Sequence, residues 1–447
     1  MKKLAAALLL LSACGPSRPE SPGLRAATFI ADATIPLGHP VCGGWNTPAT
    51  RIATPLLIKG VVLDDGRRRV VLAAIDWCVL RTSAYDRLRS ALARGAEVPD
   101  DHVALHCTHT HSAPIADARA QELLDGVRGA PPHLDLAFFA RMCEGAREAA
   151  ANAVFHLEPV VEIGYGKAKV DEFASSRRVK GPDGRIRTRF SATKDPALRD
   201  APEGTIDPWL RTVTLFGPDR PLARMHYYAT HPQTFYGDGS VHGDVVYDAR
   251  EYLQNEEGVF QVYFTGCGGD VTAGKYNDGT PEAKHRLSTR LYSGLVRAIG
   301  DTKRAPAGPI DWKVVDVRLP LHPAFEARAF RTTLEDPAAP PQRRIQAAMS
   351  LAWIERLEKR PSIDTSRLRL GPVGLVHLPG EAFVAFQLHA QAARPDRFVC
   401  VASYGEGGPG YICTDDAHAQ GGYEPTAAYV GPPSERLLRS AIDELLK

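Results

Sequence analysis

The sequence predicts an α/β fold in which a layered mixed sheet is flanked by helices, with a functional site at the carboxyl ends of the strands. Two observations predict this fold. Six apolar runs each stop abruptly at a cluster of polar residues, and segments with helical periodicity fill the intervals. Near-continuous apolar strands are typical of sheets covered on both faces. Strands that alternate with helices favour a layered architecture.

The six predicted strands end in side chains that can carry chemistry. In chain order they are Val70–Ile75 before Asp76, Val103–Cys107 before His109 and His111, Ala223–Ala229 before His231, Phe260–Phe264 before Asp270, Val373–Leu378 before Glu381, and Phe398–Ala402 before Tyr404. Sites in open α/β sheets gather outside the carboxyl ends of the strands. We therefore expect these polar residues to meet at one edge and to form a catalytic site there.

Helices are predicted where apolar residues recur at spacings of three and four. The segments are Ala84–Ala93, Leu134–Val154, Asp248–Asn255, Glu282–Ile299, Pro341–Leu357 and Glu435–Leu446. The pattern fails between Glu172 and Pro208, where the chain is polar and rich in arginine. A loop of this length inside a compact domain is usually functional or disordered. We predict a flap or insertion near the site, at about residues 172–208.

Composition and charge are those of an enzyme-sized globular protein. The chain has 447 residues, of which 44% are apolar and 24% charged, and this is ample for one large domain with a buried core. We expect a single catalytic domain over residues 25–447. The net charge of +2 gives no reason to expect nucleic acid as a partner, and no protein partner is indicated.

The first residues predict export. Lys2 and Lys3 precede the apolar run Leu4–Leu11, which is too short to span a bilayer as a mature helix. The following Ser12-Ala13-Cys14 resembles the cleavage site of a bacterial lipoprotein signal. We expect residues 1–14 to be the signal with a lipidated Cys14, and residues 15–24 to be a tether. The alternative is an ordinary secretory signal. With either signal we expect the globular domain to be periplasmic or surface-exposed. We expect contact with a membrane only through the lipidated Cys14.

Seven further cysteines are read as packing residues. An odd number leaves at least one thiol free, and the absence of a CxxC pair disfavours a thiolate zinc ribbon. We expect most of them to be buried free thiols in strands.

The stretch VALHCTHTHSAP, Val103 to Pro114, carries the strongest local signal. On an extended strand, residues two apart point the same way, so His109 and His111 share a face while His106 points to the other. A lone histidine is more often a core residue, whereas a His-x-His pair at a strand end favours a metal site. One or both imidazoles can then bind a single cation. With carboxylate ligands nearby, zinc is the first candidate.

Other hydrolase architectures fit poorly. The metallo-β-lactamase arrangement requires an Asp where this chain has Ala113. The TIM-barrel amidohydrolases require eight regular strand–helix units, which the segment at 172–208 interrupts. No GxSxG nucleophile elbow occurs, which disfavours a serine hydrolase.

The sequence does resemble the neutral, non-lysosomal ceramidase family. THTHSAP (108–114) resembles its THTHSGP motif, and YATHPQTF (228–235) the segment with its second zinc-binding histidine. GCGGDVTAG (266–274) resembles its Asn-Ala-Gly-Asn-x-Ser-Pro loop, and LPGEAF (378–383) its PGE motif. YGEGGPGYICT and GGYEP, within 404–425, resemble its tyrosine segment. The likeness runs from about residue 25 to 430, so we expect the catalytic domain without the family's C-terminal immunoglobulin-like domain.

The resemblance implies a zinc cofactor and a set of ligands. The histidine ligands match His109 and His231, and the ligating glutamate matches Glu381. On sequence grounds alone, His231 and Glu381 are as consistent with a core position as with a ligand. The family's tyrosine ligand lies in the 404–414 segment, where Tyr411 is our choice because it precedes Ile-Cys-Thr, and Tyr404 is the alternative.

The resemblance also implies catalytic residues, with two departures. His111 falls close to the metal and to the substrate carbonyl. Thr272 stands where the family has serine, which keeps a hydroxyl but adds a methyl group. Asp270 stands where the family has asparagine and adds a carboxylate near the metal.

We therefore predict a zinc-dependent hydrolase that cleaves an amide of an N-acylated, ceramide-like lipid or related N-acyl compound. A zinc-bound water attacks the carbonyl, His111 or Tyr411 holds the oxyanion, and His111 or Asp270 relays a proton to the amine. Arg177 and Arg178 face a polar or anionic head group, or are solvated surface charges. The alternatives are a zinc esterase or lactonase, and a non-catalytic lipid-binding protein on the same fold. Lipid binding without turnover would favour the binding protein over either hydrolase. A purely structural zinc is disfavoured because soft ligands are few.

Overall fold

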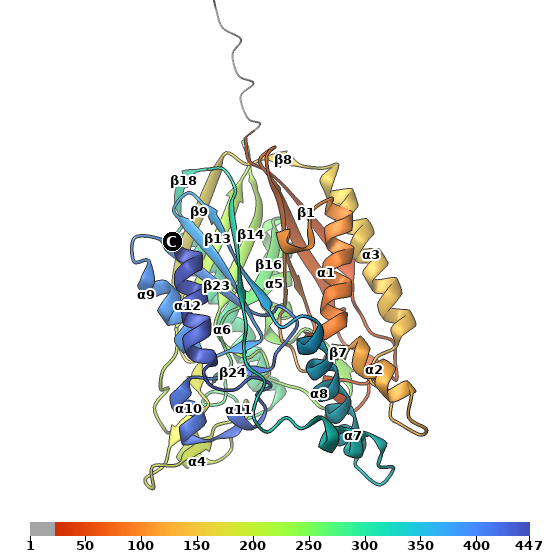
Figure 1. Ribbon diagram of the computed structural model, residues 1–447. Helices are drawn as coiled ribbons and strands as arrows, with labels where there is room; N and C mark the ends of the chain where they lie inside the picture. Colours follow the sequence, from red (N-terminus) through yellow and green to blue (C-terminus); the bar gives the residue numbers. More distant parts are fainter. Residues whose placement is uncertain (1–22) are drawn as a thin grey trace, which may run out of the picture.

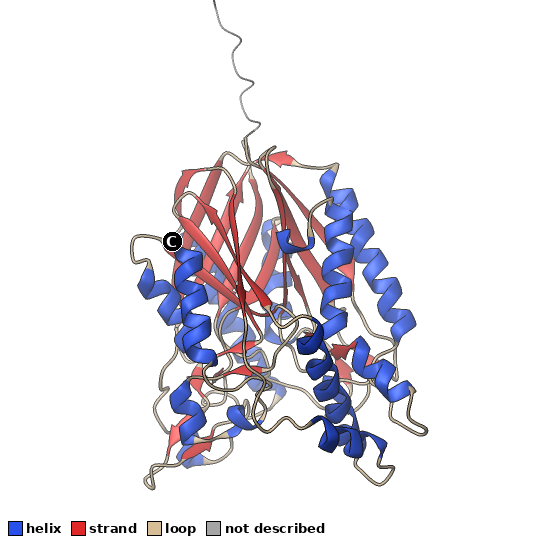
Figure 2. Cartoon of the chain, in the orientation of Figure 1, coloured by secondary structure: helices blue, strands red, loops and turns tan. Residues whose placement is uncertain are grey.

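Two β-sheets pack face to face at the centre of the molecule, and helices cover their outer faces, as the computed structural model shows (Figures 1 and 2). The structure describes residues 23–447. The predicted signal and most of the predicted tether lie outside the described residues. The predicted fold class, a layered α/β fold with a mixed sheet flanked by helices, is confirmed. The pairing of two sheets was not predicted.

The larger sheet has nine strands. Their order is β19 (Asp311–Val317), β20 (Ile363–Leu370), β21 (Val373–Pro379), β23 (Phe398–Gly405), β6 (Val103–Cys107), β4 (Arg69–Ile75), β3 (Leu57–Asp64), β1 (Arg25–Asp32) and β8 (Glu158–Pro159). The pairs β4–β6 and β21–β23 are parallel, and the neighbouring pairs are antiparallel. The sheet is therefore mixed, as predicted.

The smaller sheet has five strands and lies against the larger one. Their order is β16 (Phe260–Thr265), β14 (Pro221–Tyr228), β13 (Trp209–Phe216), β9 (Glu162–Lys169) and β18 (Lys303–Pro306). Short two-stranded ladders join the loops: β5 (Val79–Arg81) with β7 (Ile115–Asp117), β10 (Ser175–Ser176) with β17 (Val271–Thr272), β11 (Arg178–Lys180) with β12 (Ile186–Thr188), β15 (Ser240–Val241) with β2 (Arg51–Ile52), and β22 (Glu381–Ala382) with β24 (Tyr411–Ile412).

The helices form the outer layers and the lower rim in Figure 1. They are α1 (Thr82–Ala96), α2 (Ala118–Asp125), α3 (Leu136–Val154), α4 (Pro196–Arg199), α5 (Asp244–Glu257), α6 (Pro281–Gly300), α7 (Ala327–Glu335), α8 (Pro341–Lys359), α9 (Val384–Ala393), α10 (Asp415–Gln420), α11 (Tyr423–Thr426) and α12 (Ser434–Leu446), with 3-10 turns at Cys42–Gly44 and Asp100–His102. Among residues 23–447, none combines the length and apolarity needed to cross a bilayer.

Alternate residues of the central strands pack into two different hydrophobic cores, one on each face of the sheet. On β4, Leu72 and Ala74 pack between the sheets, whereas Val71 and Ile75 pack beneath α1 and α3. The helices α5 and α6 cover the outer face of the smaller sheet, and α9 and α12 cover the other end of the larger one. Both faces of each central strand are buried, which explains the near-continuous apolar runs in the sequence.

The two halves of the larger sheet meet at a single residue pair, Gly405 with His106. Both residues lie near the carboxyl ends of their strands, β23 and β6. A Cβ at position 405 would lie 2.7 Å from atoms of the His106 ring and 2.9 Å from the carbonyl oxygen of Leu105. Glycine thus permits the approach that brings the loops after β6, β21 and β23 together.

Candidate metal centre

His109 and His111 lie in a turn beyond strand β6, not on the strand itself. His109 has φ of +69°, in the left-handed region that side chains other than glycine seldom adopt. Its N–H donates to the carbonyl of Trp77 at 3.0 Å. The prediction that the strand pleat points both histidines the same way is therefore wrong. The left-handed turn makes them converge instead, with Nε2 atoms 3.3 Å apart.

His231 and Glu381 reach the same point from two other loops. His231 follows β14 of the smaller sheet, and Glu381 follows β21 of the larger sheet. The carboxylate atom Oε2 of Glu381 lies 3.4 Å from Nε2 of His109 and 3.4 Å from Nε2 of His231. The site thus spans the carboxyl ends of strands from both sheets.

Hydrogen bonds fix which ring nitrogens are free. Nδ1 of His109 donates to the carbonyl of Cys78 at 2.8 Å, and Nδ1 of His231 donates to the carbonyl of Gly268 at 2.6 Å. Because a carbonyl only accepts, both Nε2 atoms carry lone pairs when the rings are neutral. Nε2 of His231 and Oε2 of Glu381 are buried with no hydrogen-bond partner among the described residues. Three acceptors therefore face one another.

The pKa shifts favour the same protonation states. Burial lowers the pKa of His109 to about 3, and the neighbouring Glu381 offsets only part of this effect. Burial and the charge of Arg177 lower the pKa of His231. Burial raises the pKa of Glu381, but the adjacent imidazoles outweigh it and bring the value to about 2. Near neutral pH the group consists of neutral imidazoles and one carboxylate.

This donor set fits a divalent cation. Unpaired buried acceptors are costly unless a cation or proton lies between them. Tetrahedral ligands at roughly 2.0–2.2 Å from zinc lie roughly 3.3–3.6 Å from one another, and the observed separations are 3.3 and 3.4 Å. His109, His111 and His231 form a histidine-rich group able to hold a metal ion. The geometry is therefore compatible with a divalent cation such as zinc.

Tyr404 and Tyr411 take different positions. The ring of Tyr404 stacks on His109 at 4.2 Å, and its hydroxyl lies 3.3 Å from Nδ1 of His231, on the side away from Glu381. Tyr411 pairs with Glu381 in the β22–β24 ladder and lines the cavity at the metal group. Its hydroxyl accepts a hydrogen bond from Nη1 of Arg177 at 2.7 Å. Of the two, only Tyr411 is among the residues that line the cavity.

The two arginines of the predicted flap have different surroundings. Arg177 is buried and donates to Tyr411, whereas Arg178 forms an ion pair with Glu424 at 2.9 Å. Neither is a solvated surface charge. The segment around them contains β10, β11, β12 and α4.

Thr272 and Asp270 lie behind the metal group. Thr272 forms a backbone bridge with His231, and its buried hydroxyl has no partner among the described residues. Asp270 accepts a hydrogen bond at 2.8 Å from the N–H of Val384, the first residue of α9. Burial raises the pKa of Asp270 to about 7. Neither side chain is among those that line the cavity. Asp76, which also ends a strand, pairs with the buried Arg250 at 2.9 Å.

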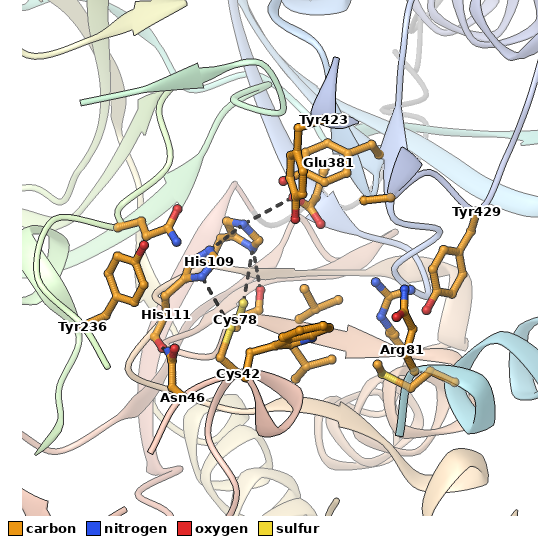
Figure 3. Close-up of a pocket in the computed structure, with 18 of the residues that line it drawn as sticks. Cys42, Asn46, Cys78, Arg81, His109, His111, Tyr236, Glu381, Tyr423 and Tyr429 are labelled. Atoms are coloured by element: carbon orange, nitrogen blue, oxygen red, sulfur yellow. Dashed lines mark hydrogen bonds and ion pairs between the residues drawn. The ribbon is translucent and has the colours of Figure 1, made fainter. Parts of the chain in front are cut away.

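A cavity of about 510 Å³ opens onto the histidines (Figure 3). Residues that sequence reasoning did not select line it, among them Cys42, Trp45, Cys78, Arg81, Tyr236 and Tyr429. Cys42 lies 3.5 Å from Nδ1 of His111. No motif pointed to these residues, because they come from loops that only the tertiary fold brings together. The seven described cysteines are all free and buried, as predicted, but only Cys107 and Cys400 lie in strands, so the prediction that most of them are strand residues is wrong.

No family model and no curated protein sequence matches the chain. Solved structures do match it, and two of them are ceramidases. Neutral ceramidase from Pseudomonas aeruginosa is similar at a TM-score of 0.71, with 16% identity, covering 96% of this chain and 74% of that one. A ceramidase complexed with C2 is similar at a TM-score of 0.70, with 14% identity, covering 95% and 75%. The chain therefore has the neutral ceramidase fold, as its motifs indicated.

Proposed function

We propose that this protein is a zinc-dependent hydrolase that cleaves the amide bond of an N-acylated, ceramide-like lipid or a related N-acyl compound. One observation carries the proposal: the Nε2 atoms of His109 and His231 each lie 3.4 Å from the carboxylate of Glu381. The fold shared with neutral ceramidases and the cavity beside this group support the same activity.

In this proposal His109, His231 and Glu381 hold the zinc, with Tyr411 at its edge. Together they supply neutral imidazoles and one carboxylate, the ligand types zinc takes in hydrolases. When bound, zinc polarises a carbonyl and lowers the pKa of a water molecule toward neutrality. The carbonyl groups of Cys78 and Gly268 keep both ligand rings oriented and in the correct tautomer.

The chain's own residues supply proton transfer and oxyanion binding. His111 is only half-buried and lines the cavity. Burial and the neighbouring imidazoles lower its pKa well below the usual value, so the ring is neutral at neutral pH and one of its nitrogens can accept a proton during the reaction. It then returns that proton to the departing amine. The hydroxyl of Tyr411, fixed by Arg177, donates toward the carbonyl oxygen as negative charge develops. Thr272 and Asp270 hold His231 and α9 in place.

The test is hydrolysis by the holoprotein of N-lauroyl amides and the matching lauroyl esters. We expect amide cleavage that a chelator abolishes and added zinc restores, and that is lost in Glu381→Gln. His156→Gln, an exposed histidine at the end of α3, is the matched control and should keep full activity. Ester cleavage alone would replace the amidase by an esterase or lactonase. Lipid binding without any turnover by the zinc-loaded protein would replace it by a binding protein.

Export and anchoring through Cys14 are part of the proposal. The basic start, the short apolar run and Ser12-Ala13-Cys14 support it. Metabolic labelling with a fatty acid in a bacterial host should mark the parent protein and leave Cys14→Ser unlabelled. Equal labelling of the two would contradict lipidation at this residue.

A further inference from the structure

Arg81 lies on the wall of the cavity across from the histidines (Figure 3). It ends strand β5 and is 6% exposed. Its guanidinium packs over the ring of Tyr429 at 4.2 Å. Nη1 donates to the carbonyl of Gly408 at 3.0 Å, and Nε has no partner among the described residues. A permanently charged fork is thus held at the cavity with most of its donors unused.

Several other buried arginines have a carboxylate partner or use most of their donors, although among the described residues Arg177 and Arg344 likewise form no ion pair. Arg89 pairs with Asp364 at 2.8 Å, and Arg250 pairs with Asp76 at 2.9 Å. Arg189 has no carboxylate partner, but it donates to several backbone carbonyls. Within residues 23–447, Arg81 forms no ion pair, and the carboxylates of Asp117 and Glu381 attract its charge only from beyond ion-pair distance. A buried charge without a direct partner is costly. Its surroundings therefore favour an anion.

Asp117, the residue of β7 in register with Arg81, attracts its charge but forms no ion pair with it. One of its oxygens accepts from the hydroxyl of Thr82 at 2.6 Å and from the N–H of Ala120 at 3.1 Å. These bonds tie Asp117 to the start of α1 and α2 rather than to the guanidinium. The backbone beside Arg81 is also fixed by Thr82, which has φ of +41° and whose N–H donates to the carbonyl of Gly407 at 3.1 Å.

The charges that line the cavity are unbalanced. Glu381 is the single carboxylate of the lining, and it belongs to the metal group. Arg343 adds a second guanidinium, which is exposed near the ring of Trp45 at 6.0 Å and has no ion pair in the part of the chain that the structure describes. A bound divalent ion would add further positive charge. The field in the cavity attracts anions.

Apolar side chains form another part of the wall. Ile115, Met349 and Tyr429 contribute to it. A second cavity of about 530 Å³ shares Tyr429 and Ala427 with the first and is lined by Phe325 and Phe330. An acyl chain can therefore extend from the metal group along apolar surface, past the position of Arg81.

We infer that the substrate carries a carboxylate that Arg81 binds, and that it is an N-acyl amino acid rather than a neutral ceramide. This inference rests on the proposed hydrolase and specifies its substrate class. The planar guanidinium accepts a carboxylate in a bidentate pair, which fixes both distance and orientation. The scissile amide then lies between Arg81 and the histidines.

The experiment compares N-lauroylglycine with N-lauroylethanolamide, which share the acyl chain and differ in the carboxylate. We expect kcat/KM at least about tenfold higher for the glycine compound. Arg81→Gln should remove this preference, because KM should rise much more for N-lauroylglycine than for the ethanolamide. Arg81→Lys, which keeps the charge without the fork, should fall between. Arg220→Gln, an exposed arginine paired with Glu158, is the control and should match the parent.

A binding measurement separates this inference from the proposed function. Calorimetry with chelator-treated protein reports whether N-lauroylglycine binds when hydrolysis is stopped. Arg81-dependent binding without turnover by the zinc-loaded protein would reject the hydrolase and keep the carboxylate site. Equal cleavage of both compounds, unchanged by Arg81→Gln in a protein with the parent's circular dichroism spectrum, would overturn the inference and keep the hydrolase.

Discussion

The rings of His109 and Tyr404 stack with centroids 4.2 Å apart, and both residues have left-handed backbone conformations, with φ of +69° and +63°. Such conformations cost about 1–3 kcal/mol for residues other than glycine and persist only where the surroundings enforce them. Here the stacked rings stabilise two strained turns, one after β6 and one at the end of β23. The turn at His109 thereby places its Nε2 3.4 Å from the carboxylate of Glu381.

This arrangement predicts different roles for the ring and the hydroxyl of Tyr404. Tyr404→Ala should lower zinc affinity by about 10–100-fold, because the ring that orients His109 is lost. Tyr404→Phe should bind zinc like the parent. Competition with a chromophoric chelator measures both, with the exposed Tyr252→Ala as the control. Equal losses in the two variants would make the hydroxyl a ligand and contradict this account.

Tyr411 and Arg177 should act as a pair. Tyr411→Phe removes the hydroxyl that accepts from Arg177 at 2.7 Å, and we expect kcat to fall by about 10²-fold. Arg177→Gln should cost less, because the hydroxyl remains. The double variant should fall no further than Tyr411→Phe, which a steady-state kinetic cycle checks. Additive losses would show that the two residues act independently.

The strands and helices were predictable because their signals are local. Both faces of β4 and β6 are buried, so the apolar runs were unbroken, and α6 repeats its apolar residues at helical spacing. The division into two packed sheets was not predictable, because apolar periodicity does not state which strands pair. The contact that joins the halves of the larger sheet depends on one glycine, Gly405, among many.

The candidate site was predictable only in part. His109, His231 and Glu381 follow apolar runs, and the structure brings them together at 3.4 Å. The turn at His109 has no sequence signature, because no residue in Thr-His-Thr-His indicates a left-handed backbone conformation. Arg81 gave no signal either, because its unpaired charge depends on which residues surround it in the fold.

Gly405 should tolerate no side chain. Gly405→Ala places a Cβ 2.7 Å from atoms of the His106 ring, and we expect a loss of about 1–3 kcal/mol in the free energy of unfolding. Gly374→Ala, on the neighbouring strand β21 with no heavy atom within 4 Å of its added Cβ, should change it by less than about 0.5 kcal/mol. Urea denaturation measures both. Equal effects would mean that the close approach at 405 is not required.

Arg178 should matter for stability. Its pair with the buried Glu424 would leave an uncompensated carboxylate in Arg178→Gln, which should cost about 3 kcal/mol. Urea denaturation measures it, and Arg187→Gln, whose pair with Asp195 is exposed, is the matched control at less than about 1 kcal/mol. Similar losses of unfolding free energy in the two variants would mean that the Arg178 pair contributes no more than an exposed ion pair.

His226 should make the protein acid-sensitive. Burial lowers its pKa to about 3, and the bond to Gln261 offsets only part of this. Because the unfolded value is about 6.5, the unfolded chain binds more protons below that value, and stability falls with pH between about 6.5 and 3. From about pH 7 to about pH 5 the loss is about 2 kcal/mol. His226→Gln should reduce the difference in unfolding free energy between these pH values by that amount, and an unchanged difference would contradict a neutral buried His226.

The most direct test is the metal content of protein purified without residues 1–14, measured by plasma mass spectrometry beside His109→Ala, His231→Ala and Glu381→Ala. We predict about one zinc per chain in the parent, little in the three variants, and the parent's content in the control His156→Ala. A parent that holds no metal even after zinc is supplied, or variants that keep it, would contradict a catalytic zinc at this group.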